Sequence, residues 1–152
     1  MKIAIGADHA GFELKQQLLP LLQGADYDVT DCGTNSTAAV DYPDYAKRVA
    51  KGVAGGEFER GILICGTGLG MCITANKVAG VRAVTVHDCF SAVETRRHND
   101  SNILTLGGRV VAVGLAWEIV RLWLATPFVG GERHERRVEK IRALESGEGM
   151  RH

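Results

Sequence analysis

The stretch that decides the fold is Gly61-Ile62-Leu63-Ile64-Cys65-Gly66-Thr67-Gly68-Leu69-Gly70. Its first half is an almost unbroken apolar run, which is typical of a central strand in a parallel sheet that is covered on both faces. Its second half is rich in glycine, so the backbone can turn sharply there. We expect the chain to continue from this turn into a helix that ends near residue 77. A strand, a tight turn and a helix form the repeating unit of an α/β protein.

The same alternation continues in both directions from this stretch. We expect strands at 3–6, 28–31, 61–65, 82–86 and 103–106. We expect the other helices at 12–22, 45–54, 89–97, 115–124 and 132–144. Pro20 should bend the first helix or end it early. Right-handed connections at this spacing predict a three-layer α/β/α fold: a Rossmann-like, five-stranded parallel sheet with helices on both faces and a C-terminal helix.

Composition limits the classes of protein to consider. The chain has 152 residues, which predicts a single domain over 1–145, followed by a polar tail at 146–152 that we expect to be flexible. Its 18 basic and 18 acidic residues balance, so we expect no nucleic-acid partner. No apolar stretch is long enough to span a bilayer, and the first residues look like a strand rather than a signal peptide. The four cysteines form no C-x-x-C pair, which favours free thiols in the cytoplasm.

In an open parallel sheet, ligands bind beyond the carboxyl ends of the strands. The glycine-rich run at 65–70 follows such a strand, but it matches neither the dinucleotide fingerprint nor the P-loop. By itself it indicates a site for an anion or an oxyanion. Cys65 stands beside the amides of this run, which would stabilise a thiolate. The alternative is that Cys65 is a small buried hydrophobic residue, as free cysteines often are.

Two polar pairs are further candidates. Asp8 and His9 follow the first strand, where they would either contact a ligand or form a helix cap and a surface imidazole. His98 and Asn99 end the fourth helix, where a cation suits the helix dipole without any further role.

Arg133 and Arg137 lie four residues apart and therefore share one face of the last helix. Such a pair can grip a phosphate. It can equally be a solvated face whose partners are Glu132, Glu135 and Glu139. No cysteine or histidine spacing matches a zinc site, so we expect no metal and no cofactor.

Taken in order along the chain, these motifs resemble the ribose-5-phosphate isomerase B family, which includes galactose-6-phosphate and allose-6-phosphate isomerases. The matching pieces are GADHAG (6–11), DYP (41–43), CGTGLG (65–70), ANK (75–77), RHN (97–99), GGR (107–109) and RHERR (133–137). Each piece is weak alone, but the seven cover almost the whole chain. The resemblance implies interconversion of ribose 5-phosphate and ribulose 5-phosphate, without a cofactor, through a cis-enediolate.

The resemblance also implies roles for the loop. Cys65 matches the general base that removes the proton from C2 of the open-chain sugar. One branch of the family uses a Glu further along this loop, but here Met71 stands at that position, so the chain looks like the cysteine branch. Thr67 matches a residue close to the reacting oxygens. The oxyanion hole corresponds to Gly66, Gly68, Leu69 and Gly70.

Other roles are implied for residues outside the loop. His98 matches the acid–base group that opens the furanose ring, and Asn99 matches a neighbour that binds the intermediate. The residues that match contacts to the sugar or its phosphate are Asp8, His9, Tyr42, Arg109, Arg133 and Arg137.

Members of this family are homodimers or homotetramers that share active sites between subunits, so the resemblance implies that the partner supplies His98, Asn99 and Arg109. The apolar stretch at 117–124 would either pack against such a partner or be buried in its own chain. Two alternatives remain for the function. One is an isomerase of another sugar or sugar phosphate, such as allose 6-phosphate or galactose 6-phosphate, and the other is a non-catalytic nucleotide-binding module.

Overall fold

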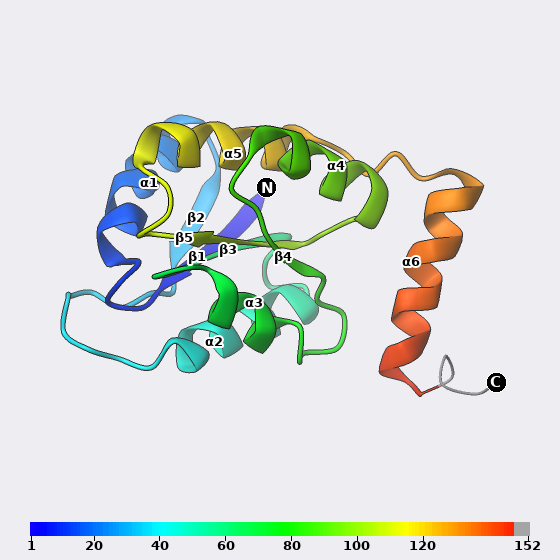
Figure 1. Ribbon diagram of the computed structural model, residues 1–152, viewed down its shortest axis with the longest axis horizontal. Coiled ribbons are helices and arrows are strands. Elements are labelled where there is room, and N and C mark those ends of the chain that lie inside the picture. Colours follow the sequence, from blue (N-terminus) through cyan, green and yellow to red (C-terminus); the bar gives the residue numbers. More distant parts are fainter. Residues whose placement is uncertain (148–152) are drawn as a thin grey trace.

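The computed structural model describes residues 1–147 and contains one five-stranded parallel sheet in the order β2-β1-β3-β5-β4 (Figure 1). Its strands are β1 (Lys2–Ala7), β2 (Asp28–Asp31), β3 (Arg60–Cys65), β4 (Ala83–Thr85) and β5 (Ile103–Gly107). The run that decided the prediction is β3, and it lies in the middle of the sheet between β1 and β5. The central position explains why this strand carries no polar side chain between its ends.

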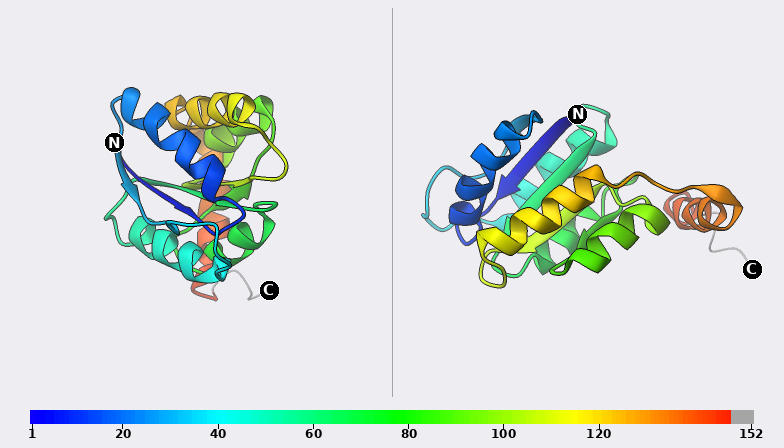
Figure 2. Two further views of the ribbon diagram at one scale, coloured as in Figure 1. Left: turned by 90° about the vertical axis from the view of Figure 1, so that its left-hand side faces the viewer. Right: turned by 90° about the horizontal axis from the view of Figure 1, so that it is seen from above.

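Helices cover both faces of the sheet, as predicted. One face carries α1 (Phe12–Gly24), α4 (Cys89–Asn99) and α5 (Val113–Ala125), and the other carries α2 (Tyr42–Ala54) and α3 (Leu69–Ala75). The last helix, α6 (Gly131–Glu145), stands apart from both layers at one end of the molecule (Figure 2). The predicted α/β/α class is therefore confirmed.

The apolar stretch of α5 is used within its own chain. Ile119, Val120 and Trp123 are fully buried in the core between α5 and the sheet. The indole of Trp123 donates a hydrogen bond to Ser101 Oγ at 2.9 Å, so its polar atom is satisfied. Of the two alternatives for this stretch, burial in the chain's own core is the correct one for these residues.

Pro20 does not end α1 early, which was one of the two outcomes expected of it. The helix continues past Pro20 to Gly24. Pro20 lies on the exposed side, whereas Leu14, Leu18 and Leu22 bury the opposite side against the sheet. Packing of that leucine stripe outweighs the one backbone hydrogen bond that proline cannot donate.

The topology separates two edges of the sheet. All five strands are parallel, so their carboxyl ends meet at one edge. The helix that joins β4 to β5 runs back to the opposite edge, where α4 ends at Asn99. No helix among residues 1–147 has the length and apolarity needed to cross a bilayer. The predicted tail from residue 146 onward lies mostly outside the described residues.

Candidate active site

A cavity of about 350 Å³ opens at the carboxyl edge of the sheet. This volume is within the range of small-molecule sites. Eight of the predicted site residues line it together with Ala10: Asp8, His9, Tyr42, Cys65, Gly66, Thr67, Gly70 and Arg109. A larger groove of about 540 Å³ lies along α2, and it contains none of the predicted residues.

The Cys65 thiol lies at the end of β3, and the residue is only 5% exposed. Its Sγ accepts a hydrogen bond from the Gly68 amide at 3.1 Å. Among the described residues, the amides of Gly66 and Thr67 donate to no backbone or side-chain acceptor, so they remain available beside the thiol. One amide therefore supports the sulfur, and its neighbours can receive a negative oxygen.

Two glycines are required for this loop to fold. Gly68 has a φ of +79°, and a Cβ added there would lie 2.9 Å from the backbone of Leu106 in β5. A Cβ added at Gly70 would lie 2.6 Å from the ring of Tyr42, which packs directly over the loop. The side chain of Leu69 between them is 56% exposed, so Leu69 can contribute through its backbone.

Asp8 and His9 follow β1, the neighbour of β3, and line the same cavity as the loop. Asp8 Oδ1 accepts hydrogen bonds from the amides of Ala10 and Gly11, which fix the carboxylate at the start of α1. His9 Nδ1 accepts the Val40 amide at 3.2 Å. The proton of a neutral His9 imidazole is therefore on Nε2, which makes this nitrogen a donor for a ligand.

Arg109 corrects one expectation. We expected a partner subunit to supply it, but its side chain lines the cavity of its own chain. The reason is the adjacency of β5 and β3: the Arg109 amide donates to the Gly66 carbonyl at 3.0 Å, two residues beyond the end of β5. The guanidinium thus adds a positive charge beside the Cys65 loop.

The remaining predicted residues form a second group, away from this cavity. His98 stacks on His134 of α6, with ring centroids 4.4 Å apart and ring planes within 8° of parallel. His98 Nε2 lies 3.1 Å from a carboxylate oxygen of Glu94. Desolvation lowers the pKa of His134, and the nearby His98 and Arg133 lower it further. Asn99, Arg133 and Arg137 belong to the same end of the molecule, on α4 and α6.

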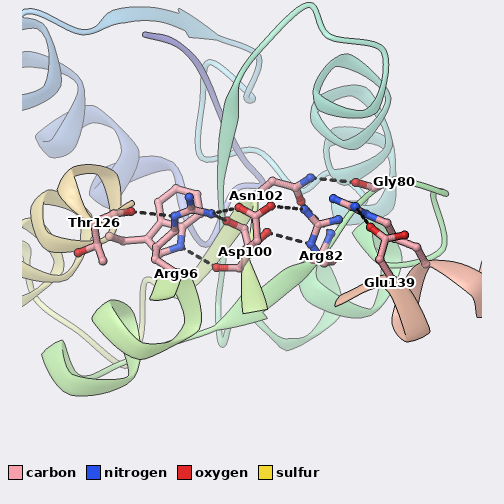
Figure 3. A network of polar contacts seen from close by, with 10 residues as sticks. Gly80, Arg82, Arg96, Asp100, Asn102, Thr126 and Glu139 are labelled. Carbon is pink, nitrogen blue, oxygen red and sulfur yellow. Dashed lines mark hydrogen bonds and ion pairs between the residues drawn. The ribbon is translucent and has the colours of Figure 1, made fainter. Parts of the chain in front are cut away.

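A network of ionic contacts holds the end of α4 (Figure 3). Asp100 receives hydrogen bonds from Arg96 at 2.8 Å and from Arg82 at 3.2 Å. Arg96, which is 2% exposed, also donates to the carbonyls of Ser101 and Thr126. The network therefore joins α4, the start of β5 and the segment that leads to α6. The network thereby holds in place the end of α4, which carries His98, and the segment that leads to the arginines of α6.

Comparison with known proteins agrees with this arrangement. Residues 3–141 match the family model described as Ribose/Galactose Isomerase. The chain belongs to the ribose/galactose isomerase family. It is 51% identical to ribose-5-phosphate isomerase B of Escherichia coli over 95% of this chain and 96% of that protein.

Solved structures of related isomerases share the fold over nearly their whole length. Ribose-5-phosphate isomerase B from Clostridium thermocellum superposes with a TM-score of 0.94 at 50% identity, covering 97% of this chain and 99% of that one. The enzyme from Mycoplasma genitalium with bound ribulose 5-phosphate gives 0.91 at 41% identity, covering 95% and 96%. Membership in the ribose/galactose isomerase family makes the chain an isomerase, not a nucleotide-binding module.

Sequence reasoning missed residues that support the cavity of this isomerase. Lys15 is 1% exposed, and its ammonium contacts both carboxylate oxygens of Asp31 and the carbonyl of Thr34. These bonds anchor the segment that leads to Val40 and hence to His9. The available signal was a lysine next to the buried leucine stripe of α1, where a charge needs a partner.

Proposed function

We propose that the chain interconverts ribose 5-phosphate and ribulose 5-phosphate by proton transfer through a cis-enediolate. The observation that carries the proposal is the Cys65 thiol, which accepts the Gly68 amide in the lining of a cavity that also contains Asp8, His9 and Arg109. An aldose–ketose isomerase needs a base, a stabiliser for a negative oxygen and polar groups that hold the sugar. The cavity offers all three.

In the proposed mechanism, the Cys65 thiolate removes the proton from C2 of the open-chain aldose. The electron pair of the broken C–H bond forms the C1–C2 double bond, and the carbonyl oxygen at C1 becomes negative. The free amides of Gly66 and Thr67 stabilise this oxygen, with Gly68, Leu69 and Gly70 shaping the hole. Cys65 then returns the proton to C1, while the hydroxyl proton moves from O2 to O1 beside the Thr67 hydroxyl.

The other contacts to the sugar come from side chains that line the cavity. The Asp8 carboxylate accepts from sugar hydroxyls, and His9 donates through Nε2. Tyr42, whose ring packs on Gly70, lines the cavity beside them. These roles require no metal and no cofactor.

Two copies of the chain complete the site in this proposal, as a homodimer or as a homotetramer. His98 of one copy opens the furanose ring in the other, and Asn99 binds the intermediate. Arg133 and Arg137 of the copy that supplies His98 bind the phosphate together with Arg109 of the copy that supplies Cys65. The supporting observation is that His98 lies at the edge where strands begin, whereas Cys65 lies at the edge where they end.

A cytoplasmic location completes the proposal. A thiol that acts as a base must stay reduced, and the cytosol maintains that state. All four cysteines of the chain are free.

A panel of substrates tests the function. The purified protein is assayed with ribose 5-phosphate, allose 6-phosphate, galactose 6-phosphate and unphosphorylated ribose. The highest kcat/KM is expected for ribose 5-phosphate, and a higher value for either hexose phosphate would reassign the substrate. The same reaction in D₂O should place deuterium at C1 of ribulose 5-phosphate, because the thiol exchanges its proton with water. Complete absence of deuterium under all conditions would argue against proton transfer by an exchangeable base.

A further inference from the structure

His87 lies in the turn between β4 and α4, and it is absent from the lining of the active-site cavity. Its Nε2 nevertheless accepts a hydrogen bond from the Gly107 amide, at 2.9 Å, at the end of β5. An acceptor nitrogen must carry a lone pair, so the imidazole is neutral and its proton is on Nδ1. The bond joins two turns at the carboxyl edge of the sheet.

Gly107 is directly connected to the catalytic loop. The next two amides, those of Gly108 and Arg109, donate to the carbonyls of Cys65 at 2.8 Å and of Gly66 at 3.0 Å. A Cβ added at Gly107 would lie 2.9 Å from the Cα of Thr67, so the two backbones are in close contact. A displacement of Gly107 would therefore move Thr67 and the backbone of Cys65.

The surroundings of His87 favour the neutral imidazole. Burial lowers its pKa below the ordinary 6.5, and the neighbouring carboxylate of Asp88 opposes this shift with a smaller effect. The first turn of α4 carries no acidic residue. On strand β5, which pairs with β4, the nearby groups are the uncharged Thr105 and the Gly107 amide. Arg109, which follows β5, lines the active-site cavity instead.

We propose that His87 is a positioning residue of the isomerase, whose neutral imidazole holds Gly107 and thereby the turn that supports the Cys65 loop. Protonation turns Nε2 into a donor that faces another donor, so the hydrogen bond is lost. Because the pKa is lowered, the bond is present at neutral pH and is lost as the pH falls through the lowered value. The proposal rests on the isomerase function stated above.

Two substitutions separate positioning from simple structural support. His87→Gln places an amide oxygen at about the reach of Nε2, where it accepts from Gly107 but does not titrate. His87→Leu removes the acceptor. The measurement is the profile of kcat and KM for ribose 5-phosphate between pH 5 and pH 9. At pH 8, His87→Gln should retain activity within about 2-fold, and His87→Leu should lose about 10-fold in kcat, the order expected when a backbone amide loses its partner.

The behaviour of kcat and KM at acidic pH decides between the two roles of His87. The activity of wild-type protein relative to His87→Gln should fall as the pH drops below about 6.5. A ratio that stays constant with pH, or a His87→Gln variant that is as impaired as His87→Leu at pH 8, would overturn the proposal.

Nuclear magnetic resonance of the free wild-type protein provides a readout that needs no substrate. The Gly107 amide resonance should move with the titration of the His87 ring, and in His87→Gln this movement should disappear. A Gly107 resonance that does not shift as the His87 ring titrates would overturn the inference even if the enzyme is active. An inactive wild-type protein with an intact Gly107 response would instead refute the proposed function.

Discussion

The cavity around Cys65 and the group around His98 contain the two halves of one predicted site, but they are built differently. In the cavity, the functional groups follow strand ends and are tied by backbone amides, as in the 3.1 Å bond from Gly68 to Cys65. The second group lies on helices and is more exposed, with 41% of the His98 side chain accessible. The order of the strands positions the residues of the cavity, whereas side-chain ion pairs such as Arg96–Asp100 position the group around His98.

This difference is the reason for proposing that a second copy of the chain completes the site. A helix between parallel strands must return to the edge where the next strand starts, so the end of α4 is directed away from Cys65. Helix α6, which contains Arg133 and Arg137, stands apart from the two helical layers at one end of the molecule (Figure 2). Val138 is its one buried residue among those described, and Ile141 and Leu144 are 44% and 55% exposed. A second copy of the chain can bring the two halves together.

Removal of the sulfur should have the largest effect. Cys65→Ala should lower kcat about 1,000-fold, the order contributed by a positioned base, because the methyl group cannot accept a proton. Cys72→Ala, which removes a partly buried thiol from α3, is the matched control and should stay within a few-fold of wild type. Similar turnover in both variants would eliminate Cys65 as the base.

The second half of the site should affect binding more than turnover. Arg137→Ala should raise KM for ribose 5-phosphate by about 10- to 100-fold, since a charge-assisted hydrogen bond contributes about 1.5–3 kcal/mol. KM for unphosphorylated ribose should barely change. Arg136→Ala on the same helix is the control. An equal rise of KM for both sugars would show that Arg137 does not bind the phosphate.

A side chain added at Gly68 should have a smaller effect, which is measurable as a lower free energy of unfolding. Gly68→Ala should lower the free energy of unfolding by about 2 kcal/mol, because alanine disfavours a positive φ and its Cβ would press on Leu106. Gly24→Ala, where an added Cβ meets nothing within 4 Å, should be neutral or slightly stabilising. Chemical denaturation of both variants measures the difference, and equal stabilities would contradict the loop geometry.

Chelation should have the smallest effect. Proton transfer by a thiol and stabilisation by amides require no Lewis acid, so prolonged treatment with EDTA should leave kcat/KM unchanged. A loss of activity that a divalent ion restores would reveal a metal in the reaction.

The sequence predicted the fold well because apolar runs such as Ile62 to Ile64 have one stable place, the centre of a sheet. It also predicted that Asp8 and Cys65 lie at one edge, because both follow the ends of parallel strands. It did not predict that His87 accepts the Gly107 amide or that Lys15 binds Asp31 and the Thr34 carbonyl, because no motif records such partners. The assignment of Arg109 to a partner failed because strand order, which places β5 beside β3, was not considered in it.

The measurement that tests the central claim most directly is complementation between two inactive variants. Cys65→Ala and His98→Ala chains should each be inactive alone, since each lacks one half of every site. After mixing under conditions that exchange subunits, activity should return to roughly a quarter of the wild-type level if pairing is random and dimeric. Mass spectrometry of differently tagged chains verifies that exchange has occurred. Mixed dimers that recover no activity would contradict a site assembled from two copies of the chain.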